Sequence, residues 1–343
     1  MAREEKTIAI AGAGSIGCYV GGCLALAGRK VALLARPRVE AALRKDGLRV
    51  SDLDGRARRI APAALSVTAD PAEALAGANI VLVTVKSGAT EAMAALIAAH
   101  ARPDAVTVSL QNGVDNAEKL RARLAGRHVL AGMVPFNVVH SPDEATFHVH
   151  RASEGKVMIE DGVAGLAGLL DVEGLGVETH ADMKAVLWGK LLMNLNNALV
   201  ALSDQPLATE LADRRWRLIL AAQIDEALAA MRASGIRPAR IAGLRPALLP
   251  KVLGLPDWLF RRLARRMLAI DPEARSSMWD DLRRGRPTEI GELQGAVLAR
   301  AERSGVPAPM TERVAALVRE AEAARRGPPG LAPEAVRPDR RSG

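Results

Sequence analysis

The chain has 343 residues and a formal net charge of +8 at pH 7, and 49% of its residues are hydrophobic. This length suits two domains with a sizeable aliphatic core, and the positive charge favours anionic small molecules such as phosphorylated cofactors. Only eight residues (four Trp, three Phe and one Tyr) are aromatic, and they are scattered along the chain, which argues against a stacking surface for nucleic acid.

The cysteine, histidine and hydropathy patterns indicate in which cellular compartment the protein resides and whether it binds a metal. Cys18 and Cys23 have no histidine nearby, so we expect small core residues in a reducing compartment. His148 and His150 share a strand face without a third ligand, so we expect no metal site. Residues 7–28 carry no charge but contain six glycines, which is unlike a continuous membrane span. We therefore expect a cytoplasmic protein that binds neither a membrane nor nucleic acid.

Short aliphatic runs alternate with helical stretches over the first 140 residues. The runs that predict strands are 6–12, 30–36, 79–86 and 105–113, followed by 128–140 and 147–160, and the helical stretches are one ending near Gly28, then 71–77 and 91–100. Strands separated by helices indicate a parallel, doubly wound sheet of the Rossmann type. We assign residues 1–179 to this α/β nucleotide-binding domain.

The pattern changes to helical periodicity near residue 180. Helices are expected at 182–202, 207–234, 257–269, 288–304 and 310–325, with Pro and Gly between them. Residues 180–326 are therefore assigned to an all-helical second domain. The final segment, 327–343, is rich in Pro, Gly and Arg and is expected to be disordered. The sequence leaves open whether the protein is a monomer or a homodimer.

The motif GAGSIG, residues 12–17, lies between the first predicted strand and helix and is typical of a dinucleotide-binding turn. In such a turn Gly12 allows the tight bend, Gly14 lets the backbone approach a pyrophosphate, and Gly17 lets the helix and strand pack closely. The N–H groups at the helix N-terminus then face the phosphates. The expected cofactor-binding residues of the turn are Gly12, Ala13, Gly14, Ser15, Ile16 and Gly17.

Three polar residues at later strand ends are further candidate ligands of the cofactor. Arg36, with Arg38 nearby, stands where an NAD site has Asp or Glu, and a guanidinium suits a 2′-phosphate. This favours NADPH/NADP+ over NADH, the alternative being a solvated loop charge. Lys86 is either a second phosphate partner or a surface lysine. Asn112 ends another strand and is expected near the nicotinamide.

The segment WGKLLMNLNNALVALS, residues 188–203, places polar side chains on an otherwise apolar helix. At about 100° per residue, Asn194 lies roughly 40° and Asn197 roughly −20° from Lys190. These three residues therefore form one narrow polar stripe, as the wall of a binding site has, whereas Asn196 points elsewhere and is a packing or capping amide. The alternative is a hydrogen-bond network between helices.

The second polar cluster is SSMWDDLRRGRPTEI, residues 276–290. Ser276 and Ser277 precede a hydrophobic pair, and Glu289 is expected in the first turn of the helix that follows Pro287. A carboxylate there either belongs to the site or only compensates the helix dipole.

Six segments occur in an order that resembles the ketopantoate reductase (2-dehydropantoate 2-reductase) family, over residues 7 to about 320. They are GAGSIG, VTVKS, LQNG, WGKLLMNLNNALVAL, SSMWDD and GRPTEI. The resemblance implies a Rossmann domain followed by a helical domain like that of 6-phosphogluconate dehydrogenase, with the active site between them. It also implies NADPH-dependent reduction of a small 2-oxo acid.

The resemblance implies a role for each candidate residue. Lys190 would be the general acid that protonates the ketone oxygen, and Glu289 would bind the substrate hydroxyl beside the cofactor and fix the lysine. Asn112 would bridge the nicotinamide and this lysine. The remaining assignments are substrate binding by Asn194, Asn197, Ser276 and Ser277, 2′-phosphate binding by Arg36 and Lys86, and a main-chain cofactor contact near Val138.

Two departures from the family pattern concern the substrate. The family's second substrate-binding Asn lies eight residues after the lysine, where this chain has Ala198, and Asn197 is expected to substitute for it. Residues 236–275 are longer than the compact form of the fold needs and precede the substrate serines. The alternatives are therefore a reductase of another 2-oxo acid, or a non-catalytic NADP(H)-sensing protein.

Overall fold

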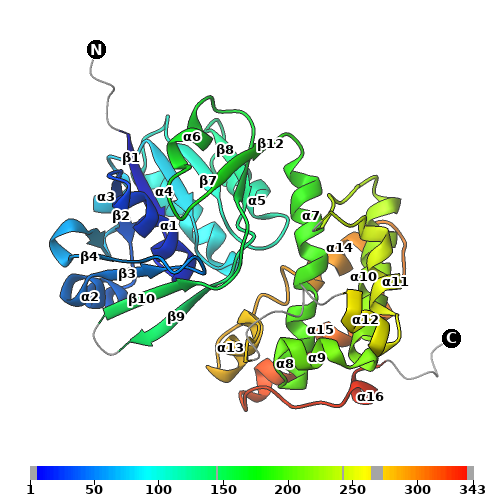
Figure 1. The fold of residues 1–343 in the computed structure, drawn as a ribbon. Helices are drawn as coiled ribbons and strands as arrows, with labels where there is room; N and C mark the ends of the chain where they lie inside the picture. The colour runs from blue at the N-terminus through cyan, green and yellow to red at the C-terminus, as the bar shows by residue number, and fades with distance from the viewer. Residues whose placement is uncertain (1–5, 144–145, 242, 264–272, 338–343) are drawn as a thin grey trace. The chain divides into compact units, whose positions relative to one another are not determined.

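The structure is a computed structural model that describes residues 6–143, 146–241, 243–263 and 273–337. The chain divides into two compact units, which meet between Met183 and Lys184. In Figure 1 the first unit runs from blue to green along the chain and the second from green to red.

The first unit is built on an eight-stranded sheet of order β12-β11-β8-β7-β6-β1-β2-β5. Its six strands from β8 to β5 pair in parallel, and β11 joins β8 antiparallel. This confirms the predicted Rossmann-type parallel sheet. The strands are β1 (Thr7–Ala11), β2 (Lys30–Leu34), β5 (Ser66–Thr68), β6 (Ile80–Val83), β7 (Val106–Ser109), β8 (Val129–Met133), β11 (Val157–Glu160) and β12 (Val177–His180).

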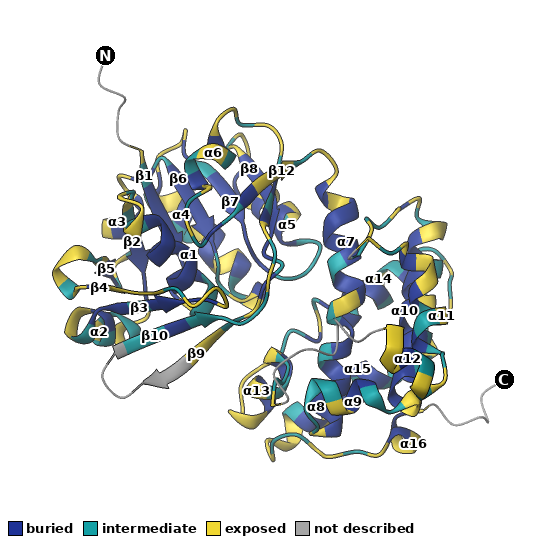
Figure 2. Cartoon of the chain, in the orientation of Figure 1, coloured by how far each residue is buried: buried dark blue, intermediate teal, exposed yellow. Residues whose placement is uncertain are grey.

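Apolar side chains cover both faces of this sheet, as a parallel sheet requires. Strand β1 shows the alternation: Ile8 and Ile10 belong to one buried cluster, whereas Ala9 and Ala11 belong to another. Figure 2 shows these central strands as buried. The covering helices include α1 (Ser15–Leu26), α2 (Pro37–Asp46), α3 (Pro71–Leu75), α4 (Thr90–His100), α5 (Asn116–Arg123) and α6 (Leu166–Leu170).

A second, four-stranded sheet of order β4-β3-β10-β9 was not expected. Its strands are β3 (Leu48–Ser51), β4 (Ala57–Ile60), β9 (Val138–Asp143) and β10 (Thr146–Arg151). It packs close to α1, because a Cβ on Gly22 would lie 2.6 Å from Val50 Cγ2. Strands β3 and β4 are short and rich in arginine, so hydropathy did not reveal them.

The histidines and cysteines of the first unit that sequence analysis singled out have structural surroundings. Ser51 Oγ lies 2.8 Å from His148 Nε2 and 2.7 Å from His150 Nδ1. No cluster of three metal-ligating side chains occurs among the described residues. Cys18 and Cys23 are free and buried, and burial raises the pKa of each thiol to about 12.

The second unit is helical, and two of its expected helices are divided. The helix predicted at 182–202 is interrupted at Leu195, and the one predicted at 207–234 at Asp213, whose carboxylate caps the following helix by accepting from Arg215 N at 2.8 Å. The helices are α7 (Met183–Asn194), α8 (Asn196–Ser203), α9 (Leu207–Ala212), α10 (Arg214–Ala233), α11 (Leu249–Leu253), α12 (Asp257–Leu263), α13 (Ser277–Arg283), α14 (Gln294–Arg303), α15 (Pro309–Ala324) and α16 (Pro333–Val336).

One stretch, Met183–Ser203, is long and apolar enough to cross a membrane by length and composition. However, 78% of its apolar window is buried inside the protein, as in the core helix of a folded domain. The uncharged segment 7–28 forms a strand, a turn and a helix of 12 residues.

The expectation of a disordered tail is wrong for residues 327–337. Leu331 N donates to Leu202 O at 2.8 Å, and Val336 is fully buried on the short helix α16. The composition of this segment favoured disorder, but a few apolar residues between its prolines anchor it to the unit. The last residues of the predicted tail, 338–343, lie outside the described residues.

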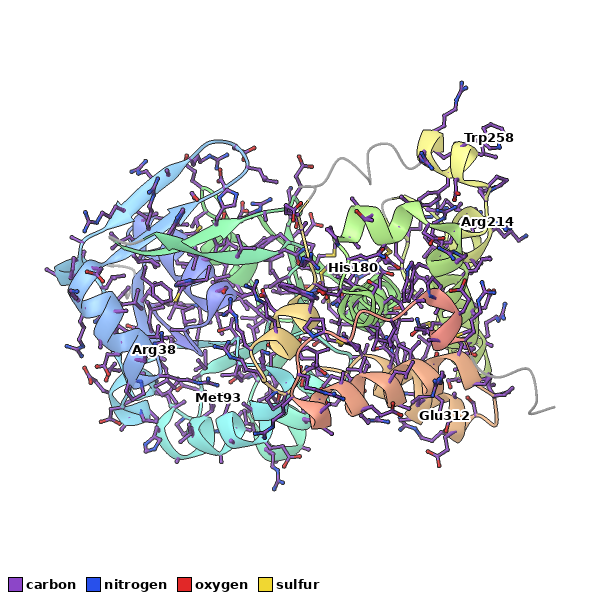
Figure 3. The ribbon with its side chains drawn as sticks, turned by 90° about the horizontal axis from the view of Figure 1, so that it is seen from below. Arg38, Met93, His180, Arg214, Trp258 and Glu312 are labelled. Carbon is purple, nitrogen blue, oxygen red and sulfur yellow. The ribbon has the colours of Figure 1, made fainter. Side chains whose placement is uncertain are left out.

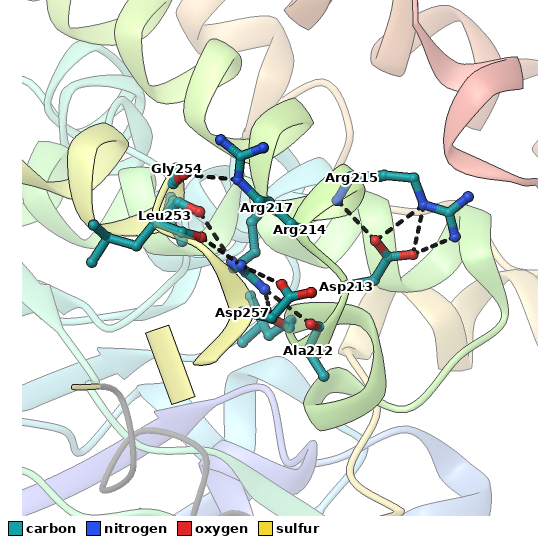
Figure 4. Close-up of polar contacts among 10 residues, drawn as sticks. Ala212, Asp213, Arg214, Arg215, Arg217, Leu253, Gly254 and Asp257 are labelled. Atoms are coloured by element: carbon teal, nitrogen blue, oxygen red, sulfur yellow. Dashed lines mark hydrogen bonds and ion pairs between the residues drawn. The ribbon is translucent and has the colours of Figure 1, made fainter. Parts of the chain in front are cut away.

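The described part of the long segment 236–275 is held by a buried arginine. Arg217 is fully buried on α10 and donates to the carbonyls of Leu253 (3.0 Å) and Leu255 (2.9 Å), at the end of α11. It also pairs with Asp257 at 2.8 Å, at the start of α12 (Figure 4). On the same helix Trp258, labelled in Figure 3, is 71% exposed. Most of the predicted helix 257–269 beyond α12 lies outside the described residues.

Candidate functional site

The glycine turn after β1 has the backbone that its sequence predicts. Gly12 has φ = +118°, which favours glycine. A Cβ at this position would also lie 2.6 Å from Val85 Cγ1 and 2.8 Å from Val85 N. Gly12 is therefore required both for the bend and for the close approach of the neighbouring strand end.

Gly17 and Gly14 serve opposite steric needs. A Cβ on Gly17 would lie 2.1 Å from Gly12 O and 2.7 Å from Thr84 Oγ1, so α1 can pack against the strands only with glycine there. A Cβ on Gly14 would meet nothing within 4 Å. Gly14 thus borders open space at the start of α1, the position at which turns of this kind approach a pyrophosphate.

The N-terminus of α1 offers backbone amides to this space. The first intrahelical hydrogen bond joins Cys18 N to Gly14 O at 2.8 Å, so the amides of Ser15, Ile16 and Gly17 precede the helical ladder. Such amides bind phosphate oxygens. Ala13 is different, because its N–H donates to Leu34 O at 2.9 Å and is part of the sheet.

Four candidate cofactor ligands follow parallel strands that are neighbours in the sheet. Gly12, Arg36, Lys86 and Asn112 come after β1, β2, β6 and β7, whose parallel register places their carboxyl ends at one edge. This edge is where doubly wound folds bind nucleotides. The structure therefore brings these four residues to the same side of the first unit.

Arg36 is exposed between β2 and α2, and its carbonyl accepts from Val39 N at 2.8 Å. Across the described ranges, its guanidinium has neither an acidic partner nor a hydrogen bond. Arg38 lies in the first turn of α2 (Figure 3). Lys86 is exposed and begins the turn before α4. Both Arg36 and Lys86 present a positive charge to solvent at this edge.

A buried polar network, which sequence analysis missed, holds the loop that carries Asn112. Asn112 O accepts from Ser87 Oγ at 2.8 Å and from Asn116 Nδ2, and Asn116 Oδ1 lies 2.9 Å from Thr90 Oγ1. Gln111 Nε2 donates to Thr90 Oγ1 at 2.7 Å. The network joins the loops after β6 and β7 and so fixes the backbone of Asn112.

Val138 belongs to the second sheet rather than to a strand end of the first. It begins β9, pairs with Arg151 and packs partly against the core of the unit. Its suggested main-chain contact with the cofactor remains a prediction.

In the second unit, the predicted polar stripe coincides with the open face of α7 and α8. From Ala185 to Ser203, every residue is buried except Lys190, Met193, Asn194 and Asn197. These four follow the i, i+3, i+4, i+7 spacing of one helical face. Ala198 is fully buried, so Asn197, and not position 198, carries the polar group on this face.

Lys190 and Glu289 form the charged pair of the second unit's site. Burial lowers the pKa of the Lys190 ammonium to about 8, although the negative charge of Glu289 acts in the opposite direction. An amine with this pKa is protonated below pH 8 and gives up its proton readily near neutral pH, as a general acid must.

Glu289 does not lie in the first turn of a helix, as had been expected. Helix α14 begins only at Gln294, and residues 289–293 form a turn in which Leu293 N donates to Glu289 O at 3.0 Å. Dipole compensation by its position at a helix N-terminus therefore does not explain Glu289. The turn brings its carboxylate near Lys190 instead.

The two serines differ in structure. Ser276 caps α13: its hydroxyl accepts from Trp279 N at 3.1 Å and donates to Asn197 O at 2.9 Å. Ser277 is the first residue of α13 and is exposed. Ser276 thus attaches α13 to the Asn197 backbone, and Ser277 is the serine whose side chain faces outward.

Asn196 lies in a buried cluster behind the stripe. Its Nδ2 donates to Glu210 Oε2 at 3.0 Å, and both side chains are buried. Burial raises the pKa of Glu210 to about 8, although this hydrogen bond and the charge of Arg217 act to lower it. Asn196 therefore has a packing role, in agreement with its predicted position on the helix.

Comparisons with known proteins match both units to one family. The family model described as "Ketopantoate reductase PanE/ApbA" matches residues 8–163, and "Ketopantoate reductase PanE/ApbA C terminal" matches residues 182–322. The 2-dehydropantoate 2-reductase of Halobacterium salinarum is 30% identical over 324 residues, which cover 92% of this chain and 98% of that protein.

Solved structures show the same similarity. The PanE/ApbA family ketopantoate reductase from Ralstonia eutropha JMP134 is 31% identical with a TM-score of 0.78, covering 93% of this chain and 99% of that one. A D-mandelate dehydrogenase, solved in a ternary complex with NADH and anilino(oxo)acetate, shares the fold at 20% identity and a TM-score of 0.74, with coverage of 93% and 99%.

Proposed function

Since this chain belongs to the ketopantoate reductase family of oxidoreductases, we propose that it reduces 2-dehydropantoate (ketopantoate) to pantoate with NADPH, in pantothenate and coenzyme A biosynthesis. One observation carries the proposal: Lys190, a half-buried residue on the partly open face of α7, has a buried ammonium with a pKa of about 8 and Glu289 beside it. The two buried free thiols suit a cytoplasmic enzyme.

The first unit supports the choice of nucleotide. The amides of residues 15–17, the open space beside Gly14 and the steric need for Gly12 and Gly17 fit a dinucleotide pyrophosphate. The exposed guanidinium of Arg36 would hold the 2′-phosphate with Lys86. Asn112, fixed by its buried network, would orient the nicotinamide end. Bound NADPH supplies the hydride.

The residues of the second unit then act on the substrate. Hydride addition to the ketone carbon builds negative charge on the ketone oxygen, and Lys190 stabilises that charge and donates a proton to the oxygen. Glu289 holds the ammonium in place, and its carboxylate accepts a hydrogen bond from the substrate hydroxyl. Asn194, Asn197 and the outward-facing Ser277 bind the substrate carboxylate and its neighbours, while Ser276 holds the backbone of Asn197.

A second candidate is reduction of a different 2-oxo acid by the same residues. The observation that favours it is the position of the side-chain amide. Ala198 is buried, and the amide on the open face belongs to Asn197 instead. A shift of one residue along a helix moves the amide by about 100° around the axis and 1.5 Å along it. The substrate groups that it meets would differ accordingly.

The test is steady-state oxidation of NADPH and, in parallel, NADH against a panel of 2-oxo acids that includes ketopantoate. We expect turnover with NADPH and the largest kcat/KM for ketopantoate. A kcat/KM at least tenfold larger for another acid would support the second candidate. NADPH binding without turnover of any 2-oxo acid would contradict a reductase and favour a sensing protein.

A further inference from the structure

A buried amide links the turn that carries Glu289 to the helix that carries Lys190. Gln294 is fully buried, and its Nε2 donates to Leu195 O at 2.9 Å and to Gln223 Oε1 at 3.1 Å. Both N–H groups of this amide are therefore used. One partner lies on the polar-striped helix pair, and the other lies on α10.

Leu195 is the point at which that helix pair is interrupted. α7 ends at Asn194 and α8 begins at Asn196, yet Leu195 N still donates to Leu191 O at 3.0 Å. The Leu195 backbone keeps α-helical angles (φ −57°, ψ −28°), so Gln294 bonds the carbonyl of a helical residue. The amide of Gln294 thus contacts the helix pair at the junction between Lys190 and Asn194 on one side and Asn197 on the other.

Gln294 is also rigidly connected to Glu289. Leu293 N donates to Glu289 O at 3.0 Å, and Gly295 N donates to Ile290 O at 2.9 Å. These two hydrogen bonds span residues 289–295, with Gln294 as the first residue of α14. A displacement of the Gln294 side chain relative to Leu195 would therefore move the Glu289 turn relative to α7.

We propose that Gln294 is a positioning residue, which fixes the distance between Glu289 and Lys190 by holding the Glu289 turn against the interruption at Leu195. This inference rests on the proposed function, since it concerns the same proton donor. Glu289 is the charged group that acts on Lys190, and it favours the ammonium form. Loss of the Gln294 contact should weaken that effect and lower the pKa of the lysine.

The test compares Gln294→Met with Gln223→Met. Methionine matches glutamine in length and lacks its hydrogen bonds. The Gln223 variant removes the other partner of the same amide, and Gln223 is equally buried, but it leaves the bond to Leu195. Gln294→Asn, which withdraws the amide by one methylene, is the variant to use if Gln294→Met does not fold. Glu289→Gln removes the carboxylate charge itself and therefore gives the largest decrease in the Lys190 pKa to be expected.

Two readouts separate positioning from stability. The first is the Lys190 pKa, measured from its ¹³Cε chemical shift in ¹³C-lysine-labelled protein, which needs no turnover. The second is the pH profile of kcat, with KM for NADPH as the control. We expect Gln294→Met to lower the pKa, to move the basic limb of the profile to lower pH and to reduce kcat roughly tenfold or more, with KM for NADPH unchanged.

Gln223→Met should lower the melting temperature but leave the pKa and the basic limb in place. The inference is overturned if the Lys190 pKa is unchanged in Gln294→Met and Gln294→Asn, or if Gln223→Met shifts it equally. If Gln294→Met lowers the Lys190 pKa but the wild-type protein reduces no 2-oxo acid, the proposed function alone is contradicted and the positioning role of Gln294 stands.

Discussion

The two units position their functional groups in different ways. In the first unit, backbone geometry places the site: a glycine turn, helix amides and residues that follow parallel strands meet at one sheet edge. In the second, side chains place it: Ser276, Gln294 and Asn196 each bond a group on or behind the polar stripe. In the first unit these groups follow the strands and the helix of one sheet, whereas in the second the hydrogen bonds of Ser276, Gln294 and Asn196 join separate helices.

This difference predicts where each unit is vulnerable. Substitutions in the second unit's polar groups should change chemistry while nucleotide binding survives. Added atoms in the first unit's turn should change nucleotide binding or folding. The predictions below test this division, beginning with the largest effect.

Lys190→Met should separate chemistry from nucleotide binding. The variant keeps an apolar stem but loses the proposed proton donor, so we expect turnover to fall by about 10²–10⁴-fold. The Kd for NADPH, measured by fluorescence titration, should stay within about twofold. Turnover close to that of the wild type would remove Lys190 from the general-acid role.

The pair Gly14→Ala and Gly17→Ala tests the steric division within the turn. Gly17→Ala places a Cβ 2.1 Å from Gly12 O, so it should destabilise the unit by about 1–3 kcal/mol or more. Gly14→Ala meets nothing within 4 Å and should keep its melting temperature. It should nevertheless weaken NADPH binding about tenfold, because the methyl group enters the proposed pyrophosphate space.

Calorimetric unfolding and NADPH titration of both variants measure these effects. Unchanged NADPH affinity in Gly14→Ala would place the pyrophosphate elsewhere. Equal stability of the two variants would contradict the steric account of Gly17.

Arg36→Ala tests whether a single exposed side chain sets the choice of cofactor. A charge-assisted hydrogen bond contributes about 1.5–3 kcal/mol, so KM for NADPH should rise by roughly ten- to a hundredfold. KM for NADH should change little, because NADH has no 2′-phosphate. Arg38→Ala, two residues further along the chain, is the matched control. A parallel rise of both KM values in Arg36→Ala would refute the phosphate role.

Glu210→Gln should act on the dependence of stability on pH rather than on catalysis. Burial raises the pKa of Glu210 to about 8, from an ordinary value of 4.5. Between these values the folded protein keeps a proton that the unfolded chain releases, so the stability of the unit falls as pH rises through this window. The glutamine variant lacks this dependence, and its melting temperature relative to wild type should rise from pH 4.5 to pH 8. If the melting temperatures of the variant and the wild type change in parallel from pH 4.5 to pH 8, the raised pKa of Glu210 is contradicted.

The contrast between the units also explains what the sequence could reveal. The steric roles of Gly12 and Gly17 were predicted, because steric demands on glycine depend on local backbone geometry, and the role of Gly14 beside a pyrophosphate stays a prediction. The polar stripe was predicted because helical spacing is regular. The contact of Gln294 with the Leu195 carbonyl was missed, because the two residues are 99 positions apart in the sequence.

Other misses have the same origin. Glu289 was placed in a helix that begins only at Gln294, since a turn with helix-like hydrogen bonds has the same apolar spacing. The order of residues 327–337 follows from a tertiary contact between Leu331 and Leu202, which composition does not encode. The network around Asn116 likewise joins two loops that are distant along the chain.

The two thiols provide a chemical probe of how often the core of the first unit opens. The chain has two cysteines, Cys18 and Cys23, and both lie on α1 in the nucleotide-binding unit. Thiol reagents attack the thiolate, and a buried thiol with a pKa of about 12 forms it only when the surrounding core opens. The rate of labelling by such a reagent should therefore report the opening of the Rossmann core and be independent of opening in the helical unit. A bound dinucleotide that stabilises α1 would lower this labelling rate.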